Sequence, residues 1–395
     1  VSYVDEGDGI RVSRTDYSYG YGRALRDGVV RPVLFLSYAG RMRWRTTTGD
    51  EMEAVLGQGD TADITAQAWR TALDPEGQWM PGVLRAADTR LTEVRHAIPD
   101  AGGLVIASDQ ATARAYAGLL AGITGEQPTV VLSDEAGASE RIAHFAESED
   151  RWLVAVRMVS EGVDVPRLAV GVYATSASTP LYFAQAIGRF VRARRRGEVA
   201  SIFIPSVPTI QSLASELERE RDHALDREGD ELLDDSLLEA AEREEKASES
   251  ELAEYTYQAL ESSATFDKVL YDGTEFGQVA EVGSLEELDF LGLPGILEPD
   301  QVHELLRSRH QRQVRRAAER PATQPAPQPM YRSLKEQRTL LHSLVGLRAK
   351  LTGQPHGIIH AELRRVCGGP AVGQATVAQL QSRIEHVRRQ LATGA

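Results

Sequence analysis

Residues 182–192, YFAQAIGRFVR, are of types that suit phosphate chemistry. Gln185, Arg189 and Arg192 are spaced i, i+4 and i+7, so on a helix one amide and two guanidinium groups share a face. Two forked, permanently charged donors suit the negative charge that spreads over a transferring phosphoryl group. The sequence therefore favours an anion site here. The alternative is a solvated basic helix end, and we assign residues 194–196 to that role.

The flanking residues predict where this helix begins and ends. Thr179 is a suitable N-cap, Pro180 suits the first helical position, and Gly197 follows a basic last turn. Gly188 keeps the turn beside the arginines slim. Apolar residues alternate with the polar ones, so one side of the helix is expected to pack while the arginines face something else.

The pattern Gln-x-x-Gly-Arg-x-x-Arg resembles motif VI of the superfamily 2 helicases. Residues 159–166, VSEGVDVP, resemble their motif V, and the order and spacing of the two motifs also match. The sequence SEGVDVP resembles motif V of the DNA motors related to the helicase subunits of restriction enzymes more than motif V of the RNA-remodelling DEAD-box branch. Val156 departs from the pattern, because many relatives carry threonine there, and a nucleic-acid phosphate contact is questionable at that position.

The resemblance implies a RecA-like lobe and a division of labour within the ATP site. In the family, ATP lies between two lobes: the first supplies the phosphate loop and the Asp-Glu pair that hold ATP and Mg²⁺, and the second supplies the motif VI arginines. Arg189 and Arg192 would approach the γ-phosphate as arginine fingers, and Gln185 would position phosphate or water. Gly188 would belong to the nucleotide-binding surface.

Motif V and motif IV positions receive further roles from the resemblance. Asp164 would accept a ribose hydroxyl or tether motif VI, or it is a turn residue. Gly162 would let the backbone approach the nucleotide or the strand, or it is a simple turn glycine. Ser108 and Asp109, which resemble motif IV, would lie with Ser160 near the nucleic-acid track. Ser-Asp is also a common helix N-cap pair.

From residue 101 the chain alternates short apolar strands with amphipathic helices. Strands are expected at 104–107, 130–132, 152–156, 168–173 and 202–205, and further helices at 110–121 and 139–147. This alternation predicts an α/β fold with a parallel sheet covered on both faces, followed by mostly α-helical C-terminal regions. In such sheets the functional loops follow the carboxyl ends of the strands. We expect Ser108, Asp109, residues 161–164 and the start of the motif VI helix there.

Residues 1–100 are expected to connect the end of the first motor lobe to the second, a stretch in which the resemblance is loose. Within it, residues 31–38 and 41–47 read as two strands joined in hairpin style at Ala39-Gly40, and residues 61–72 and 89–98 read as helices. Residues 101–206 are the predicted second RecA-like lobe.

The first lobe is expected to lie outside this chain. The sequence begins at Val1 without methionine and contains no Gly-x-x-x-x-Gly-Lys-Ser/Thr loop. Residues 129–136, TVVLSDEA, look like an Asp-Glu magnesium box, but without an upstream phosphate loop we interpret them as a strand and loop between motifs IV and V. The chain therefore looks like the second half of a motor, inactive by itself.

Composition narrows the environment of the protein. The 395 residues allow two or three domains, and nothing approaches a run of about 18 apolar residues, so neither a membrane span nor a membrane partner is expected. No secretory signal is expected, because no basic stretch followed by an apolar one opens the sequence. The single cysteine, Cys367, excludes an internal disulfide framework and fits a reducing cytoplasm. The net charge of −14 argues weakly against nucleic acid, but the charge is segregated.

Residues 207–320 are predicted to be an acidic helical accessory region, because residues 211–260 hold 17 Asp and Glu against 5 Lys and Arg. Residues 321–330 form a Pro-rich linker. The net charge of the module 331–395 is positive, with 10 Lys and Arg against 3 Glu. Three helices are expected in it, at 333–351, 356–366 and from Thr376. Thr376 fits a capping box at the start of the last helix.

The role of this basic module is left open between DNA binding and protein docking. The arginines that suit phosphate contacts are Arg364, Arg365, Arg383, Arg388 and Arg389. His356, His360 and Cys367 lie close together in sequence, but three candidate ligands do not justify a metal site.

The sequence thus favours the second lobe of an ATP-dependent DNA helicase or translocase, with RNA left open as the substrate. Its partners would be DNA and the N-terminal motor lobe. One alternative is a non-catalytic nucleic-acid-binding or scaffold protein that retains the lobe. A nucleotide-sugar transferase, which also pairs parallel-sheet domains, is a weaker alternative.

Overall fold

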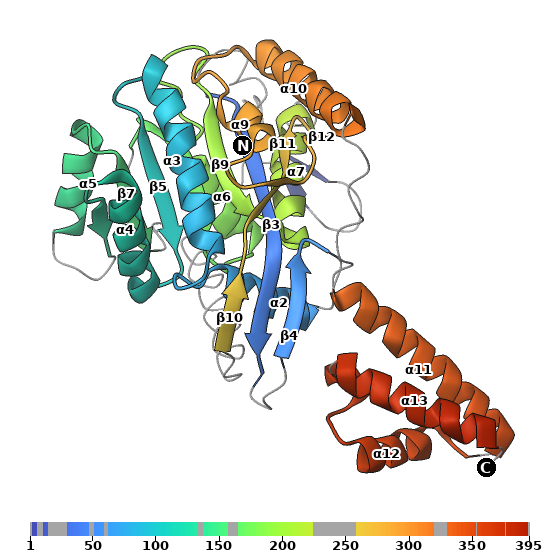
Figure 1. The fold of residues 1–395 in the computed structure, drawn as a ribbon. Coiled ribbons are helices and arrows are strands. Elements are labelled where there is room, and N and C mark those ends of the chain that lie inside the picture. Colours follow the sequence, from blue (N-terminus) through green and yellow to red (C-terminus); the bar gives the residue numbers. More distant parts are fainter. Residues whose placement is uncertain are drawn as a thin grey trace.

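A computed structural model describes residues 2–5, 11–14, 30–46, 51–58, 62–132, 137–156, 165–223, 258–319, 330–352, 354–375 and 377–393 (Figure 1). Strands β1 (Ser2–Asp5) and β2 (Arg11–Arg14) pair only with each other, as an antiparallel ribbon. The other described strands form one mixed, mostly parallel sheet with helices against it. The predicted RecA-like α/β class is confirmed.

The parallel part of the sheet contains every strand predicted from residue 101 onward. Its order is β3 (Val33–Arg45), β9 (Ala200–Pro205), β8 (Leu168–Ala174), β5 (Gly102–Ala107), β7 (Trp152–Val156) and β6 (Thr129–Val131). Strands β5, β7, β8 and β9 are buried along their whole length. Such uninterrupted apolar strands are stable only when helices cover both faces.

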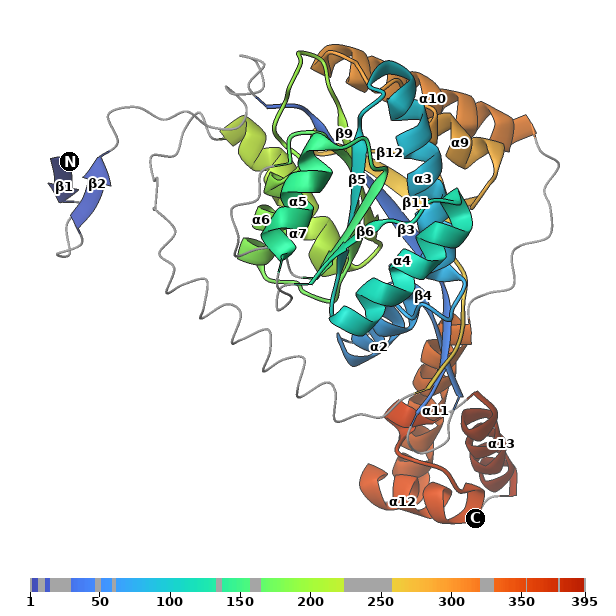
Figure 2. The same cartoon turned by 90° about the vertical axis from the view of Figure 1, so that its left-hand side faces the viewer.

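Helices cover both faces of this sheet (Figure 2). On one side lie α3 (Trp79–Ala97) and α4 (Gln110–Thr124), with α9 (Leu285–Leu291) and α10 (Pro299–Glu319) beside them. On the other side lie α5 (Ala138–Glu147), α6 (Pro180–Gly188) and α7 (Pro208–His223). The helix α3 begins ten residues before the predicted start at 89, because its buried first half starts with Trp79 and accommodates Pro81 in the first turn.

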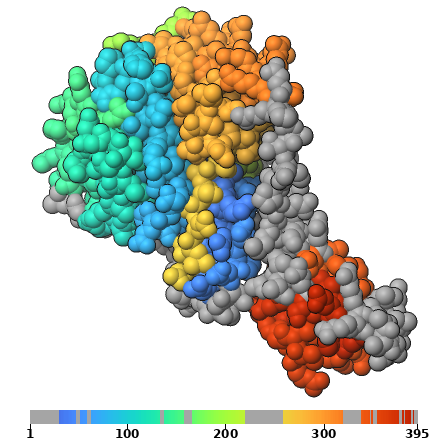
Figure 3. Space-filling model, in the orientation of Figure 1, coloured from blue at the N-terminus to red at the C-terminus, as the bar shows by residue number. Residues whose placement is uncertain are grey.

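Strand β3 is continuous, so the predicted hairpin at Ala39-Gly40 is wrong. Its first half pairs with β9 and with β11 (Thr265–Tyr271). Its second half leaves the parallel sheet and pairs with β4 (Glu51–Leu56) and β10 (Gln258–Ser262), which runs alongside it in Figures 1 and 3. Gly40 marks the change of partner: a Cβ there would lie 1.7 Å from the carbonyl oxygen of Ser263, in the loop between β10 and β11.

Segments on both sides of the predicted boundaries share one core. Buried apolar residues from Val33 to Leu306 form a single cluster, so residues 30–100 and 258–306 complete the lobe that contains residues 101–206. The predicted accessory region contains strands as well as helices, since β12 (Thr274–Phe276) and β13 (Ala280–Glu281) also pair with β11. Helix α2 (Ala62–Ala72) packs on the antiparallel extension of β3. The division of the chain into functional units stays a prediction.

The C-terminal module has the three predicted helices, α11 (Met330–Thr352), α12 (His356–Cys367) and α13 (Val377–Thr393), with the short 3₁₀ turn Val372–Gln374 between the last two. It has its own apolar core, which includes Leu341, Ile359 and Leu380. Thr376 and its predicted capping box lie outside the described residues. None of the helices in the described ranges combines the length and apolarity needed to cross a membrane.

We expect the C-terminal module to lose stability below about pH 6.5, the ordinary pKa of histidine. Burial lowers the pKa of His360, and nearby positive groups on all three helices lower it further. Those groups are His342, His356, Arg383 and Arg364. Because the unfolded module then binds more protons than the folded one below that pH, stability falls as the pH falls through this window. Thermal unfolding of the module between pH 5 and 8 measures this.

The variant His360→Gln is the control for this pH dependence, because glutamine does not titrate there. An unchanged slope of stability against pH in this variant would assign the effect to other groups.

Candidate functional site

The helix α6 begins as the sequence predicts. The side-chain oxygen of Thr179 accepts a hydrogen bond from the backbone N–H of Tyr182 at 3.4 Å, and Pro180 is the first helical residue. Phe183 is buried between β3 and β8 residues, with its ring centroid 6.0 Å from that of Phe35. This packed side of α6 fixes the direction in which Gln185 projects from the helix.

The end of α6 corrects the sequence prediction. The helix stops at Gly188, and Arg189 is its C-cap, with φ −69° and ψ −19°. Arg192 lies in a separate antiparallel bridge with Val30. Gln185 and Arg189 are therefore one helical turn apart as predicted, but Arg192 does not share their helical face.

Packing and backbone pairing together end the helix. Phe190 is fully buried against β8 at Gly171, where a Cβ would lie 2.5 Å from the ring, so only glycine leaves room for it. The N–H of Phe190 donates to the carbonyl of Ile187 at 2.9 Å, a tighter turn than an α-helix makes. The N–H of Arg31 then donates to the carbonyl of Val191 at 2.8 Å. We call residues 189–192 the arginine turn.

A buried ion pair between Arg31 and Glu198 holds the backbone of the arginine turn. The side chain of Arg31 is 1% exposed and donates from Nε to the carbonyl of Phe190 at 2.7 Å, and from Nη2 to that of Leu168. Its Nη1 lies 3.3 Å from Glu198 Oε2, and the Glu198 side chain is 0% exposed. Glu198 also accepts the backbone N–H of Arg194 at 3.0 Å. One guanidinium and one carboxylate thus fix both ends of this segment.

The arginine turn lies at the opposite edge of the parallel sheet from Ser108 and Asp109. Arg31, Leu168 and Glu198 stand at the beginnings of β3, β8 and β9, so the turn lies at the amino edge. Ser108 follows the last residue of β5, and its hydroxyl lies 3.4 Å from that of Thr175, which follows β8. These residues lie at the carboxyl edge, as predicted. Helix α6 runs from that edge back to the turn.

Asp109 acts as the N-cap of α4. Its carboxylate accepts the backbone N–H of Thr112 at 2.8 Å, and the Thr112 hydroxyl completes a capping box. Ser108 accepts the backbone N–H of Ser176 at 3.3 Å. The structure therefore supports the helix-cap interpretation of Asp109 directly. It leaves the side chain exposed at the surface, where a role toward nucleic acid stays a prediction.

The motif V residues Ser160, Gly162 and Asp164 lie outside the described residues, and so does the Asp-Glu sequence at 134–135. The flanks of motif V are described. Val156 ends β7 at the carboxyl edge, and the carbonyl of Pro166 lies 3.5 Å from Arg31 Nη2 at the amino edge. Pro166 therefore lies beside Arg31, the residue that supports the arginine turn.

The residues of α6 and of the arginine turn that are proposed to face a ligand differ in how far they are buried. Burial lowers the pKa of Arg189, which means that an anion beside this guanidinium is screened by less water than at an open surface. Arg192 is exposed. Gly188 is exposed too, and a Cβ added to it would meet no atom of the described residues within 4 Å. The side-chain oxygen of Gln185 is buried and has no hydrogen-bond partner among the described residues.

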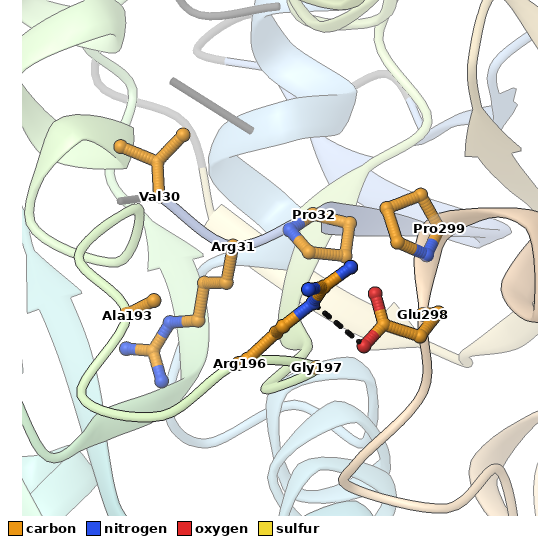
Figure 4. A pocket seen from close by; sticks show the side chains of 8 residues that line it. All are labelled: Val30, Arg31, Pro32, Ala193, Arg196, Gly197, Glu298 and Pro299. Atoms are coloured by element: carbon orange, nitrogen blue, oxygen red, sulfur yellow. Dashed lines mark ion pairs between the residues drawn. The ribbon is translucent and has the colours of Figure 1, made fainter. Parts of the chain in front are cut away.

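A small hollow lies next to Arg31, between the segment after the arginine turn and the start of α10 (Figure 4). It is lined by Val30, Arg31, Pro32, Ala193, Arg196, Gly197, Glu298 and Pro299. Its volume of about 10 Å³ matches a single water molecule. Arg196 closes it with an ion pair to Glu298 at 3.1 Å. A nucleotide does not fit in this hollow, and neither Arg189 nor Arg192 lines it.

The basic C-terminal module offers fewer exposed arginines than the sequence indicated. Arg364 and Arg365 are exposed on α12, as predicted. Arg383 is 1% exposed and donates to the carbonyls of Gly368 and Pro370, both at 2.7 Å, so its predicted phosphate contact is wrong. The side chains of residues 388 and 389 lie outside the described part of the chain.

The two residues that support the site, Arg31 and Glu198, could not be identified from the sequence. Arg31 stands with Pro32 just before an apolar strand, which is a weak local signal for a buried cation. Nothing in the sequence pairs it with a carboxylate at position 198, because that contact exists only once β3 lies beside β9.

No known protein-family model matches the chain. The uncharacterized protein Rv2917 of Mycobacterium tuberculosis (strain ATCC 25618 / H37Rv) is 53% identical over 395 residues, and the uncharacterized protein ML1624 of Mycobacterium leprae (strain TN) is 51% identical over 396 residues. Each match covers 98% of this chain but only 65% and 66%, respectively, of the relative. The chain thus spans slightly less than two thirds of these relatives, whose names state no activity.

Solved structures give weak likenesses. Domain 2 of the DEAD-box helicase Mss116p bound to an RNA duplex matches with a TM-score of 0.30 and 14% identity, over 38% of this chain and 68% of that one. A fragment assigned to an HsdR subunit of a type I restriction enzyme from Vibrio vulnificus YJ016 matches with a TM-score of 0.34 and 18% identity, over 50% of this chain and 36% of that one. TM-scores this low carry no conclusion about activity.

We expect Asp109→Ala to lower the free energy of unfolding by about 1 kcal/mol, because the backbone N–H of Thr112 in the first turn of α4 loses its side-chain acceptor. Asp109→Asn is the matched control, since asparagine caps equally well and removes only the charge. Urea unfolding followed by circular dichroism measures both. Equal stability of the alanine variant and the unaltered chain would show that the cap does not stabilise α4.

Proposed function

We propose that this chain provides the second lobe of an ATP-driven helicase or translocase that acts on DNA. The observation that carries the proposal is the arginine turn: Arg189 and Arg192 stand at the edge of a RecA-like sheet, on a segment fixed by the buried pair of Arg31 and Glu198. A turn held this firmly is suited to present cations to a ligand that another lobe supplies. The resemblance of residues 159–166 and 185–192 to helicase motifs V and VI supports the same function.

The chemistry of the lobe would be electrostatic. In phosphoryl transfer, charge develops on the γ-phosphate oxygens, and guanidinium groups placed there stabilise the transition state. Arg189, partly buried, and Arg192, exposed, would take this role. Gln185 has a buried oxygen with no partner among the described residues, which suits orientation of a water or a phosphate-bound hydroxyl. Gly162 and Asp164 would add backbone and ribose contacts.

The residues of this lobe suit ATP better than they suit Mg²⁺. The arginine turn is suited to the polyphosphate of ATP. Mg²⁺ prefers carboxylate oxygens and water, and within the described ranges no cluster of three or more His, Cys, Asp or Glu side chains is placed to hold a metal. Mg²⁺ would therefore be held mainly by the other motor lobe, where it would neutralise the phosphates.

DNA would contact the edge opposite the arginine turn. Ser108 and Asp109 lie at the carboxyl edge. A contact of Ser160 with DNA is proposed from the motif V resemblance alone. The exposed Arg364 and Arg365 of α12 would add salt-dependent, sequence-independent phosphate contacts. In this arrangement, ATP and DNA would act on two edges of the same sheet.

We expect Arg189→Ala to reduce ATP turnover by about 10³-fold or more, because the transition-state charge loses a guanidinium. The measurement is DNA-stimulated ATP hydrolysis by a form of the protein extended upstream of Val1, with this chain alone as the inactive reference. Arg196→Ala is the matched control: Arg196 is a nearby arginine, 77% exposed and outside the turn. Equal turnover in the Arg189 and Arg196 variants would contradict the finger role.

A silent extended form, with and without single- and double-stranded DNA, would favour the non-catalytic alternative. Turnover by this chain alone would mean that it holds a complete ATP site.

We expect Gly188→Ala to leave the fold intact or to stabilise it by up to about 1 kcal/mol, because alanine favours the helix and meets no described atom within 4 Å. ATP turnover should nevertheless fall, since a methyl group at this exposed position would press on a nucleotide or on the facing lobe. Thermal unfolding and turnover are measured on the same preparation. Unchanged turnover would remove Gly188 from the nucleotide surface.

A further inference from the structure

We propose that Arg31 is a positioning residue that sets the placement of Arg189 and Arg192 for catalysis. This inference rests on the proposed ATP-dependent function. Arg31 binds the backbone between the two arginines: its N–H donates to the carbonyl of Val191 at 2.8 Å and its Nε to that of Phe190 at 2.7 Å. Its influence on the arginine side chains therefore passes through the main chain that carries them.

The backbone between the two arginines is held from two sides. On one side the Phe190 ring fills the space that Gly171 leaves free on β8, so the ring cannot shift toward the sheet. On the other side Arg31 binds the Phe190 carbonyl, and Val30 pairs with Arg192 in the antiparallel bridge. In extended backbone, consecutive side chains point to opposite sides. Val191 packs against the core, and Arg192 is exposed.

The guanidinium of Arg31 also reaches the end of motif V. Its Nη2 donates to the carbonyl of Leu168 and lies 3.5 Å from that of Pro166, while Nη1 faces Glu198. A planar fork with five N–H groups can serve acceptors that lie in several directions, which a lysine ammonium on a flexible stem cannot reproduce. One side chain therefore sets the spacing between the ends of motifs V and VI.

The burial of the pair indicates a role beyond stability. With side chains 1% and 0% exposed, Arg31 and Glu198 have lost their hydration, and buried ion pairs of this kind commonly stabilise a fold no more than apolar residues of similar size do. What the pair adds is a fixed course of the backbone around it. Glu198 holds Arg31 and also accepts the backbone N–H of Arg194, so the chain is fixed immediately before and after the exposed Arg192.

The first test is amide hydrogen exchange on this chain, which needs no ATP turnover. Arg31→Lys keeps the charge but loses the fork, and Glu198→Gln keeps the shape but loses the counter-charge. Arg90→Lys is the matched control, because Arg90 is also 0% exposed and binds Ser201 Oγ at 2.9 Å and the Leu291 carbonyl at 3.1 Å, away from the turn. We expect exchange at residues 189–194 to accelerate more than about tenfold in the first two variants and not in the control.

The second test is steady-state ATP hydrolysis by the extended form. Misplacement of an arginine finger should lower kcat of Arg31→Lys by about 10²-fold and leave KM nearly unchanged, because the lost interaction belongs to the transition state. Arg90→Lys should retain kcat. If Arg31→Lys does not fold, Glu198→Gln provides the same comparison.

The two tests separate this inference from the proposed function. An extended form that hydrolyses no ATP would overturn the proposed function, and hydrogen exchange would still decide whether Arg31 holds the turn. Exchange at 189–194 no faster than in the Arg90 control would overturn the inference by itself. Accelerated exchange with an unchanged kcat would reduce Arg31 to a structural residue and would also overturn it.

Discussion

The buried ion pair between Arg31 and Glu198 is the interaction on which the geometry of the candidate site depends. It joins the start of β3 to the start of β9 and draws in the first carbonyl of β8. These contacts are made to main-chain atoms as well as to a side chain, so they fix the path of the chain. The arginine turn takes its shape from that path, because α6 itself ends before Arg192. Without the pair, the Phe190 carbonyl and the Arg194 N–H would lose their side-chain partners.

The sheet separates two groups of residues for which different roles are proposed. Helix α6 crosses one face of the sheet, so its cap at Thr179 and its C-cap at Arg189 lie at opposite edges. The helix is therefore a physical link between the two edges. In the proposed motor, nucleotide and nucleic acid would be coupled through α6.

Much of the fold followed from local pattern, and most of what was missed depends on distant contacts. The apolar strands from residue 101, the start of α6 and the three C-terminal helices were predictable, because their periodicity and caps are local. The continuous β3 was not, since Ala39-Gly40 has the composition of a turn, and only the close approach of Ser263 reveals its use. The end of α6 was mispredicted for a similar reason: burial of Phe190 against Gly171 overrides a sequence that reads as helical.

The partners of β3 in the sheet determine the order in which its two halves can pair during synthesis. Its second half can pair at once with β4, which follows a few residues later, but its apolar first half pairs with β9 and β11, at residues 200–205 and 265–271. At synthesis rates of about 5–20 residues per second, this half waits on the order of tens of seconds for its partners. During synthesis, the second half of β3 can therefore be paired with β4 while its apolar first half is still unpaired.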